Sequence, residues 1–141
     1  MSNYLSYEQF EKHVISIANL VEEDFIPDEV IGVKHGGLYL SEKIAEYFNK
    51  PHKEIHVSFY DDKEKSKIPR IVEMIRLDMS KKYLICDDLV DSGVTLQYIK
   101  SWYLGNNIKT AVLLQNKKSS FKADYFAEYY NGEWVTFAWE K

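Results

Sequence analysis

The feature that most constrains the fold is an alternation of short apolar runs with segments of helical periodicity. Apolar runs lie at residues 29–33, 83–86 and 110–114, and each is the length of a strand rather than of a helix. Between them, residues 38–48 and about 95–104 repeat their apolar side chains at helical intervals. Strands that alternate with helices pair in parallel and are covered on both faces. We therefore expect an α/β fold with a mostly parallel twisted sheet flanked by helices.

Local signals predict further elements on either side of these runs. The capping box Ser6-Tyr7-Glu8-Gln9 predicts that an amphipathic first helix occupies residues 7–23. Strands are expected at residues 54–59 and 71–77, where apolar residues recur. Residues 61–69 between them are almost wholly polar, which predicts a mobile loop.

The last part of the chain is expected to contain a β-hairpin. Asn131-Gly132 is a strong hairpin turn signal, and it separates two possible strands at residues 125–130 and 134–139. The sequence contains no internal repeat, low-complexity tract or Pro/Gly/Ser-rich linker. All 141 residues are therefore expected to form a single domain.

Composition argues against several classes of protein. The net charge of −4 argues against a dedicated binder of nucleic acid or of an anionic membrane. The single cysteine, Cys86, excludes an intramolecular disulfide and a site with several thiolate ligands. No apolar run approaches the roughly 20 residues of a membrane span, and the first residues do not resemble a signal peptide. We expect a cytoplasmic protein that binds neither nucleic acid nor a membrane.

The segment between the 83–86 strand and the following helix carries the clearest chemical signal. Two adjacent carboxylates, Asp87 and Asp88, follow the strand directly. Carboxylates held this close are unfavourable unless a cation or hydroxyl groups lie between them. A ribose diol together with Mg²⁺ meets this need, because carboxylates accept hydrogen bonds from hydroxyls and Mg²⁺ prefers oxygen ligands.

The next five residues, Asp91-Ser92-Gly93-Val94-Thr95, lead into a helix. Backbone N–H groups, two hydroxyls and the helix dipole at such a point form a cradle for phosphate. Solvated acids and a simple helix cap would explain the parts separately, and an acidic pocket like that of response regulators or haloacid-type phosphatases would explain the acid pair alone. The unbroken order of strand, acid pair, Asp-Ser-Gly-x-Thr and helix favours a 5-phosphoribose site.

This segment, Asp87 to Thr95, closely resembles the signature with which type I phosphoribosyltransferases bind 5-phosphoribosyl 1-pyrophosphate (PRPP). Its form is most similar to that of the bacterial and archaeal 6-oxopurine salvage enzymes. The resemblance implies the fold of that family, with a small hood made of roughly residues 115–141 and the N-terminal segment. It implies that Asp91 is the general base near purine N7, and that Asp87 and Asp88 hold Mg²⁺ directly or through the ribose hydroxyls. The residues implied to bind ribose and the 5′-phosphate are Asp87, Asp88, Asp91, Ser92, Gly93, Val94 and Thr95.

Two more segments extend the resemblance toward PRPP. Residues 30–38 resemble the pyrophosphate-binding loop of the family, although His35 stands where that loop usually has arginine. The residues implied to bind pyrophosphate are Lys34, His35, Gly36 and Gly37. Residues 57–61 resemble the start of the flexible catalytic loop, which implies that Ser58, Phe59 and Tyr60 close over PRPP.

The resemblance also extends to a site for the base. Residues 111–114 followed by Lys117 resemble the strand and lysine that contact the purine 6-oxo group, and Lys118 is the alternative in a register shifted by one residue. Residues 134–140 are similar to the ending of the short xanthine–guanine enzymes, with Ala138 where proline is usual. This implies that Trp134 stacks on the base and that the Val135 carbonyl contacts the purine 2-position.

Together these resemblances imply a purine salvage phosphoribosyltransferase. It would transfer the 5-phosphoribosyl group from PRPP to guanine, xanthine or hypoxanthine, with Mg²⁺, and release the nucleoside 5′-monophosphate and pyrophosphate. Family members of this size imply a homodimer or homotetramer. Two alternatives stay open: a non-catalytic regulator that binds PRPP or a nucleotide on the same fold, and a transferase that acts on a pyrimidine or another base.

Overall fold

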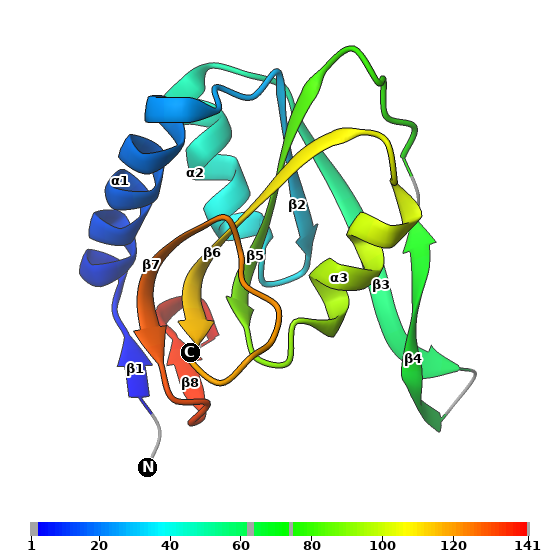
Figure 1. Ribbon diagram of the computed structural model, residues 1–141. Helices are drawn as coiled ribbons and strands as arrows, with labels where there is room; N and C mark the ends of the chain where they lie inside the picture. Colours follow the sequence, from blue (N-terminus) through cyan, green and yellow to red (C-terminus); the bar gives the residue numbers. More distant parts are fainter. Residues whose placement is uncertain (1–2, 62–63, 74, 141) are drawn as a thin grey trace.

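The computed structural model describes residues 3–61, 64–73 and 75–140, and side chains are described outside residues 59–72 (Figure 1). The elements are β1 (Asn3–Leu5), α1 (Tyr7–Asp24), β2 (Glu29–Lys34), α2 (Leu38–Phe48), β3 (His52–Asp61), β4 (Glu64–Glu73), β5 (Lys82–Val90), α3 (Val94–Trp102), β6 (Asn107–Asn116), β7 (Tyr125–Tyr130), β8 (Val135–Phe137) and a short 3₁₀ helix (Ala138–Glu140).

A six-stranded sheet in the order β4-β3-β2-β5-β6-β7 forms the centre of the molecule. The neighbours from β3 to β7 pair in parallel, and β4 pairs with β3 antiparallel. Helices α1 and α2 cover one face, and α3 covers the other (Figure 1). The expected α/β fold is confirmed.

Strand β5 shows why the sheet needs helices on both faces. Leu84 and Cys86 pack into the core shared with α1 and α2, while Tyr83 and Ile85 pack into the core on the α3 side. Successive side chains of a strand point to opposite faces, so an unbroken apolar run is buried on both. Cys86 is a buried free cysteine whose thiol pKa is raised by burial.

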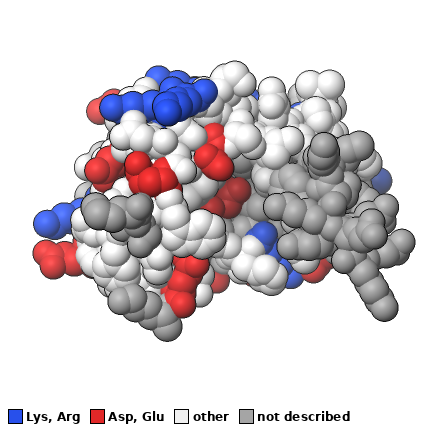
Figure 2. Space-filling view, turned by 90° about the horizontal axis from the view of Figure 1, so that it is seen from below, with Lys and Arg blue, Asp and Glu red and all other residues white. Residues whose placement is uncertain are grey.

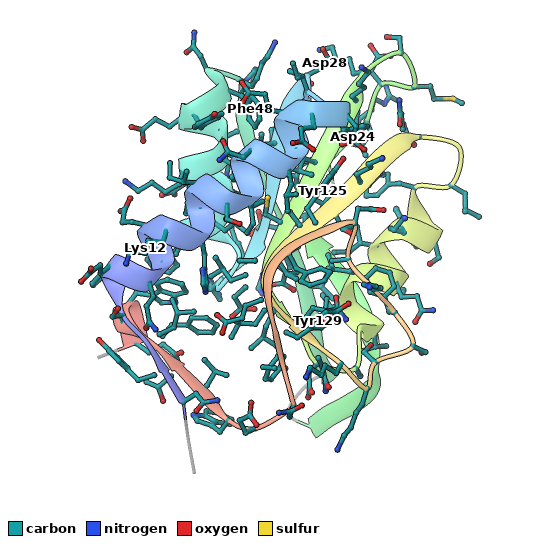
Figure 3. The ribbon with its side chains drawn as sticks, turned by 60° about the vertical axis from the view of Figure 1, so that its left-hand side comes forward. Lys12, Asp24, Asp28, Phe48, Tyr125 and Tyr129 are labelled. Carbon is teal, nitrogen blue, oxygen red and sulfur yellow. The ribbon has the colours of Figure 1, made fainter. Side chains whose placement is uncertain are left out.

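Helix α1 begins and ends close to the predicted residues. Ser6 Oγ accepts a hydrogen bond from Gln9 N at 3.1 Å, and Gln9 Oε1 accepts one from Ser6 N at 2.9 Å, which completes the predicted capping box. At the other end of the helix, the Tyr125 hydroxyl of β7 donates to Asp24 Oδ1 at 2.6 Å. Figure 3 shows these two side chains facing each other across the junction of α1 and β7.

The prediction of a C-terminal hairpin is wrong. Strand β7 pairs in parallel with β6, and β8 pairs in parallel with β1 in a separate two-stranded sheet. The chain turns at Gly132, whose φ is +89°, and leaves the main sheet. Val135 and Phe137 of β8 are buried in the same core as Leu5 of β1, so burial against β1 replaces the expected pairing with β7.

The prediction of a mobile loop over residues 61–69 is also wrong for much of that segment. Residues 64–69 belong to β4, which pairs antiparallel with β3, and β3 itself extends to Asp61. An edge strand needs backbone partners on one side only, so a polar sequence can form it. Residues 62 and 63 of the predicted loop lie outside the described residues.

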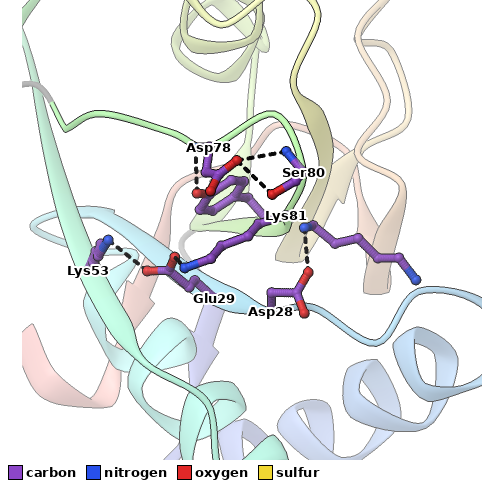
Figure 4. A network of polar contacts seen from close by, with 8 residues as sticks. Asp28, Glu29, Lys53, Asp78, Ser80 and Lys81 are labelled. Carbon is purple, nitrogen blue, oxygen red and sulfur yellow. Dashed lines mark hydrogen bonds and ion pairs between the residues drawn. The ribbon is translucent and has the colours of Figure 1, made fainter.

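A buried carboxylate forms ion pairs with two lysines at the amino-terminal end of the sheet (Figure 4). The side chain of Glu29, at the start of β2, is 5% exposed and lies 2.7 Å from Lys53 Nζ and 3.2 Å from Lys81 Nζ. Burial alone would raise the pKa of Glu29, but hydrogen bonds from Lys53 and Lys81 bring it below its ordinary value.

No helix in the described part of the chain has the length and apolar character needed to cross a membrane.

Candidate active site

The segments predicted to bind PRPP lie at the carboxyl ends of neighbouring strands. The expected pyrophosphate loop follows β2, the phosphate loop follows β5, and the lysines expected to contact the base follow β6. Figure 2 views the molecule from this end and shows acidic side chains around the middle of the face, with lysines grouped at one edge. Ligands of parallel α/β sheets bind at this end, so the fold brings the predicted segments to one place.

The acid pair lies within β5, because the strand continues to Val90 instead of ending at Cys86 as expected. Asp88 N donates to Asp87 Oδ1 at 2.8 Å, and Leu89 N donates to Asp88 Oδ1 at 2.7 Å. Burial and the adjacent charge of Asp88 raise the pKa of Asp87 well above its ordinary value, and burial raises the pKa of Asp88. A pair of this kind binds hydroxyls or a cation with a gain in electrostatic energy.

Two glycines bring the loop after β2 into contact with this acid pair. A Cβ on Gly36 would collide with the Asp88 carboxylate, whose Cγ would lie only 2.8 Å away. A Cβ on Gly37 would collide with the Cys86 carbonyl and lie 2.7 Å from Val33 O. A side chain at position 37 would therefore collide with fixed backbone, whereas one at position 36 would force the Asp88 side chain to move.

Lys34, the last residue of β2, forms ion pairs with a carboxylate of β3 and a carboxylate of β4. Its Nζ lies 3.0 Å from Glu73 Oε1 and 3.4 Å from Glu54 Oε1. The hydrogen bond to Glu73 is the main reason that the pKa of Lys34 is raised. His35 is exposed beside it, and its ring centroid lies 5.3 Å from that of His56. The structure thus places a cation next to the glycine loop but pairs it with protein carboxylates.

The segment expected to hold the 5′-phosphate forms a tight turn into α3. Gly93 has a φ of +88°, and a Cβ there would approach Phe121, with Cγ at 2.9 Å. Ser92 Oγ accepts from Val94 N at 3.3 Å, and Ser119 Oγ donates to Ser92 O at 2.9 Å. The helix starts at Val94, next to the expected Thr95. The loop after β6 therefore supports the turn that would bind phosphate.

Asp91 lies exposed between the acid pair and this turn, and it contacts two residues that sequence reasoning missed. Asn116 Nδ2 donates to Asp91 Oδ1 at 3.0 Å. The Tyr130 hydroxyl lies near Asp91: burial, followed by the nearby charges of Asp91 and Asp88, raises the pKa of Tyr130. Neither residue belongs to a recognisable motif, and only the pairing of β6 with β7 places both at this point.

The residues expected to contact the base lie at the edge of the same face. Lys117 and Lys118 are exposed directly after β6, and Lys117 N donates to Tyr130 O at 3.0 Å. Trp134 is 73% exposed, as a stacking platform requires, and its carbonyl accepts from Asn3 N at 2.8 Å. Val135 is buried in β8.

The expected flexible-loop residues fall on β3. Ser58 lies beside an irregularity in the pairing of β3 with β4. The backbones of Phe59 and Tyr60 continue that strand, while their side chains lie outside the described residues. The prediction that these residues close over PRPP is therefore not tested.

The donor set of the acid pair fits Mg²⁺. Asp87 and Asp88 supply carboxylate oxygens only, and each uses one oxygen to accept a backbone N–H. Mg²⁺ is commonly held by one or two carboxylates together with substrate phosphates and water. Among the described residues, no cluster of three or more His, Cys, Asp or Glu side chains could hold a metal ion.

The fold and this face define the type I phosphoribosyltransferase class, and comparisons with known proteins agree. A family model described as phosphoribosyl transferase domain matches residues 1–140. The crystal structure of a purine phosphoribosyltransferase from Pyrococcus horikoshii is 31% identical, with a TM-score of 0.86 over 99% of this chain and 94% of that one. The chain belongs to the phosphoribosyl transferase domain family and is a phosphoribosyltransferase.

More distant structures share the fold. A xanthine-guanine-hypoxanthine phosphoribosyltransferase from Helicobacter pylori is 23% identical, with a TM-score of 0.84 over 99% of this chain and 93% of that one. A hypothetical protein from Neisseria gonorrhoeae with bound ppGpp is 16% identical, with the same TM-score of 0.84 over 100% of this chain and 91% of that one. A comparison with curated protein sequences finds no match.

Proposed function

We propose that this protein is a purine salvage enzyme that transfers the 5-phosphoribosyl group from PRPP to a 6-oxopurine. The products would be a nucleoside 5′-monophosphate and pyrophosphate, with guanine, xanthine or hypoxanthine as the acceptor. The observation that carries the proposal is the contact of the Gly36-Gly37 loop with the Asp87-Asp88 pair. With PRPP bound, the loop would contact the pyrophosphate and the acid pair would accept hydrogen bonds from the ribose diol, on two sides of the anomeric carbon. The purine phosphoribosyltransferase from P. horikoshii, 31% identical, supports the choice of substrate class.

The phosphoribosyl group would be held from both ends. Asp87 and Asp88 would accept hydrogen bonds from the ribose hydroxyls, which relieves the repulsion within the pair. The 5′-phosphate would occupy the turn formed by residues 92–95, where backbone N–H groups and hydroxyls meet the start of α3. Holding both ends fixes C1′ between the leaving group and the base, which is where positioning contributes most to the rate.

The leaving pyrophosphate would lie against the loop after β2. Negative charge develops on it as the bond to C1′ breaks, and cationic or N–H donors aimed there stabilise the transition state. Lys34 would supply a positive charge, the backbone of Gly36 and Gly37 would supply N–H groups, and His35 would lie beside them. Mg²⁺, held by Asp87 and Asp88 directly or through the ribose hydroxyls, supplies charge neutralisation when bound.

The base would bind on the side of β6 and β8. Asp91 would act as the general base that takes the proton at purine N7. Lys117, rather than Lys118, would donate to the 6-oxo group, which disfavours 6-amino purines. Trp134 would stack on the ring, and the Val135 carbonyl would contact the 2-position. Closure of the segment containing Ser58, Phe59 and Tyr60 would exclude water from the reacting centre.

We also propose that the chain works as one domain in the cytoplasm, as a homodimer or homotetramer that binds neither nucleic acid nor a membrane. The hood would comprise roughly residues 115–141 and the N-terminal segment. The parallel pairing of β1 with β8, which joins these two segments, supports this division. Light scattering coupled to size-exclusion chromatography measures the assembly, and a monomer at micromolar concentration would contradict it.

The decisive experiment measures pyrophosphate release from PRPP and Mg²⁺ with guanine, xanthine, hypoxanthine, adenine and uracil. We expect release with at least one 6-oxopurine and none with adenine or uracil. Asp91→Asn is the matched control, because it keeps the shape of the side chain but cannot accept the proton as a carboxylate does. It should lower turnover about 100-fold or more while PRPP still raises the melting temperature. Release with adenine or uracil alone would contradict the proposal.

A second candidate function is a regulator that binds PRPP or a nucleotide without turnover. The observation that favours it is the pairing of Lys34 with Glu54 and Glu73, since a paired lysine is less available to the leaving group. The same experiment separates the two. A protein whose melting temperature rises with PRPP, but which releases no pyrophosphate with any of the five bases, is the regulator.

A further inference from the structure

The carboxylate of Asp91 is bound by side chains from two neighbouring strands. Asn116 is the last residue of β6, Tyr130 is the last residue of β7, and the two are direct partners in the parallel register. Asn116 Nδ2 donates to Asp91 Oδ1 at 3.0 Å, and the Tyr130 hydroxyl lies close enough to the same side chain to interact with it and to donate to it on a small movement. An exposed loop residue is thus connected to the rigid end of the sheet.

The Asn116 amide has its orientation fixed by a separate contact. Lys118 N donates to Asn116 Oδ1 at 2.9 Å, so that oxygen must face the loop and the amide nitrogen must face Asp91. A backbone donor of this kind distinguishes the two ends of an amide, which geometry alone does not. Gly132 leaves room for the amide, because a Cβ there would lie 3.0 Å from Asn116 Nδ2.

Tyr130 is held equally firmly. Its side chain is 7% exposed and belongs to the core that includes α1 and β8. Its carbonyl accepts from Lys117 N at 3.0 Å, so the backbone of Tyr130 and that of Lys117 are joined directly. The donors to Asp91 and the lysine expected to contact the base therefore share one frame.

We propose that Asn116 and Tyr130 are positioning residues that fix the Asp91 carboxylate in the orientation from which it takes the proton of the purine. The inference rests on the proposed function of Asp91. A free carboxylate on an exposed loop samples several rotamers, and ordering it during the reaction costs free energy. Two donor groups at the end of the sheet order the carboxylate when the protein folds, so it does not have to be ordered during the reaction. This is the general advantage of a catalytic group held by its neighbours.

A structural purpose accounts for only part of this arrangement. The hydroxyl of the buried Tyr130 gains a polar partner, but Asp91 is exposed, and a charged side chain at the surface contributes little to folding stability. The contacts instead connect Asp91 with Lys117, which follows Asn116 directly and is bonded to Tyr130. Proton acceptor and base-contacting lysine would then keep a constant separation along the purine edge.

The test compares single-atom and isosteric variants in steady-state kinetics with the 6-oxopurine that the wild type uses. Tyr130→Phe removes only the hydroxyl and should lower kcat about fivefold to tenfold, with KM for PRPP within about twofold. Asn116→Asp keeps the oxygen that accepts from Lys118 N but places a carboxylate against Asp91, so kcat should fall further. Tyr129→Phe is the matched control, since Tyr129 precedes Tyr130 on the same strand and is 42% exposed; it should leave both constants unchanged.

The variants are then combined with Asp91→Asn. If Asn116 and Tyr130 act through Asp91, Tyr130→Phe should cause no further loss of kcat in that background. An unchanged kcat for Tyr130→Phe and Asn116→Asp overturns the inference, and so does an equal loss with and without Asp91.

Crystal structures of the wild type and Tyr130→Phe give a measure independent of turnover. We expect one ordered Asp91 rotamer in the wild type and a different or disordered one in the variant, and the same ordered rotamer in both would overturn the inference. A wild type without 6-oxopurine activity contradicts the proposed function, while the crystallographic comparison still decides the positioning.

Discussion

Carboxylates at the two ends of the central sheet have opposite pKa shifts. At the amino-terminal end, Glu29 is enclosed and paired with Lys53 and Lys81, and its pKa is lowered in spite of burial (Figure 4). At the carboxyl-terminal end, Asp87 and Asp88 lie side by side, and burial raises the pKa of both. Within the described part of the chain, neither aspartate forms an ion pair with a lysine or arginine.

This difference is the one expected between a carboxylate that stabilises the fold and a carboxylate pair that binds a ligand, which is the role proposed for Asp87 and Asp88. A buried charge that only has to be tolerated is paired inside the fold, because an unpaired one costs several kcal/mol. A pair whose pKa values are pushed upward is stabilised when a ligand supplies hydroxyls or positive charge. The pairing of Glu29 therefore indicates a structural role, and the raised pKa values of Asp87 and Asp88 support the ligand site proposed at the carboxyl-terminal end.

The largest expected effect comes from neutralising Asp87 or Asp88, the pair proposed to bind the ribose diol. Asp87→Asn and Asp88→Asn should each lower turnover about 100-fold or more. A carboxylate offers two oxygens that accept hydrogen bonds from the ribose hydroxyls, whereas an amide offers one oxygen and an NH₂ group that only donates. The unfolding free energy should stay within about 1 kcal/mol of the wild type or rise, since a buried repulsion is removed. Steady-state kinetics and urea unfolding measure the two quantities. A loss of stability without a loss of turnover would mean that Asp87 and Asp88 stabilise the fold and do not bind substrate.

Alanine substitutions at the two glycines after β2 should also separate an effect on turnover from an effect on stability. Both effects should be smaller than the loss of turnover expected for Asp87→Asn and Asp88→Asn. A methyl group on Gly36 meets the Asp88 side chain, which can move, whereas one on Gly37 meets the backbone carbonyls of Val33 and Cys86, which cannot. We expect Gly36→Ala to lower turnover about tenfold with little change in stability, and Gly37→Ala to cost about 1–3 kcal/mol of unfolding free energy. Kinetics and urea unfolding of the pair decide this. Equal losses of stability would mean that Asp88 is as rigid as the backbone.

The structural carboxylate should show its effect in stability and in pH dependence. Glu29→Gln should lower the unfolding free energy by about 1–2 kcal/mol near neutral pH, because hydrogen bonds from two lysines lose their charged acceptor. The folded-state pKa of Glu29 lies below its ordinary value of 4.5, so its contribution is complete above that value and is lost as the pH falls through the lower one. The gap between wild type and variant should therefore close on acidification.

Urea unfolding at several pH values between about 7 and 3.5 checks this prediction. Exposed Glu42→Gln on α2 is the control and should match the wild type throughout. Turnover of Glu29→Gln near neutral pH should be close to that of the wild type, since Glu29 lies at the opposite end of the sheet from the candidate site. A stability gap that widens toward acid pH would contradict the assignment of Glu29 as a paired structural charge.

Local sequence signals were sufficient for the elements whose pattern is self-contained. Helix α2 has the predicted bounds, α1 is one residue longer than predicted, and β2, β5 and β6 lie over the predicted apolar runs. The acid pair and the phosphate turn could be predicted because strand, turn and helix follow one another without a gap. Their role in binding remains a prediction.

Pairings between distant segments could not be predicted from the sequence. Strand β1 has three residues and no pattern of its own, and it exists because β8 pairs with it across the length of the chain. The Asn131-Gly132 signal is local, and the burial of Val135 and Phe137 against β1 overrides it. Asn116 and Tyr130 were missed for the same reason, since only the register of β6 with β7 brings both to Asp91.

The smallest expected effect concerns Lys34. This lysine is expected to contact pyrophosphate, but it forms ion pairs with Glu54 and Glu73. Glu73→Gln removes its closer carboxylate partner at 3.0 Å, so the lysine becomes more available to a bound anion. The ion pair is exposed, and such pairs have modest strength. We expect Mg²⁺-pyrophosphate to bind about twofold to fivefold more tightly to Glu73→Gln than to the wild type, as measured by calorimetry. Lys34→Ala should weaken this binding, and the double variant should bind no better than Lys34→Ala. The control, Glu46→Gln, changes an exposed glutamate of α2 and should leave binding unchanged. Tighter binding that survives in the double variant would show that Glu73 repels the anion directly, without Lys34.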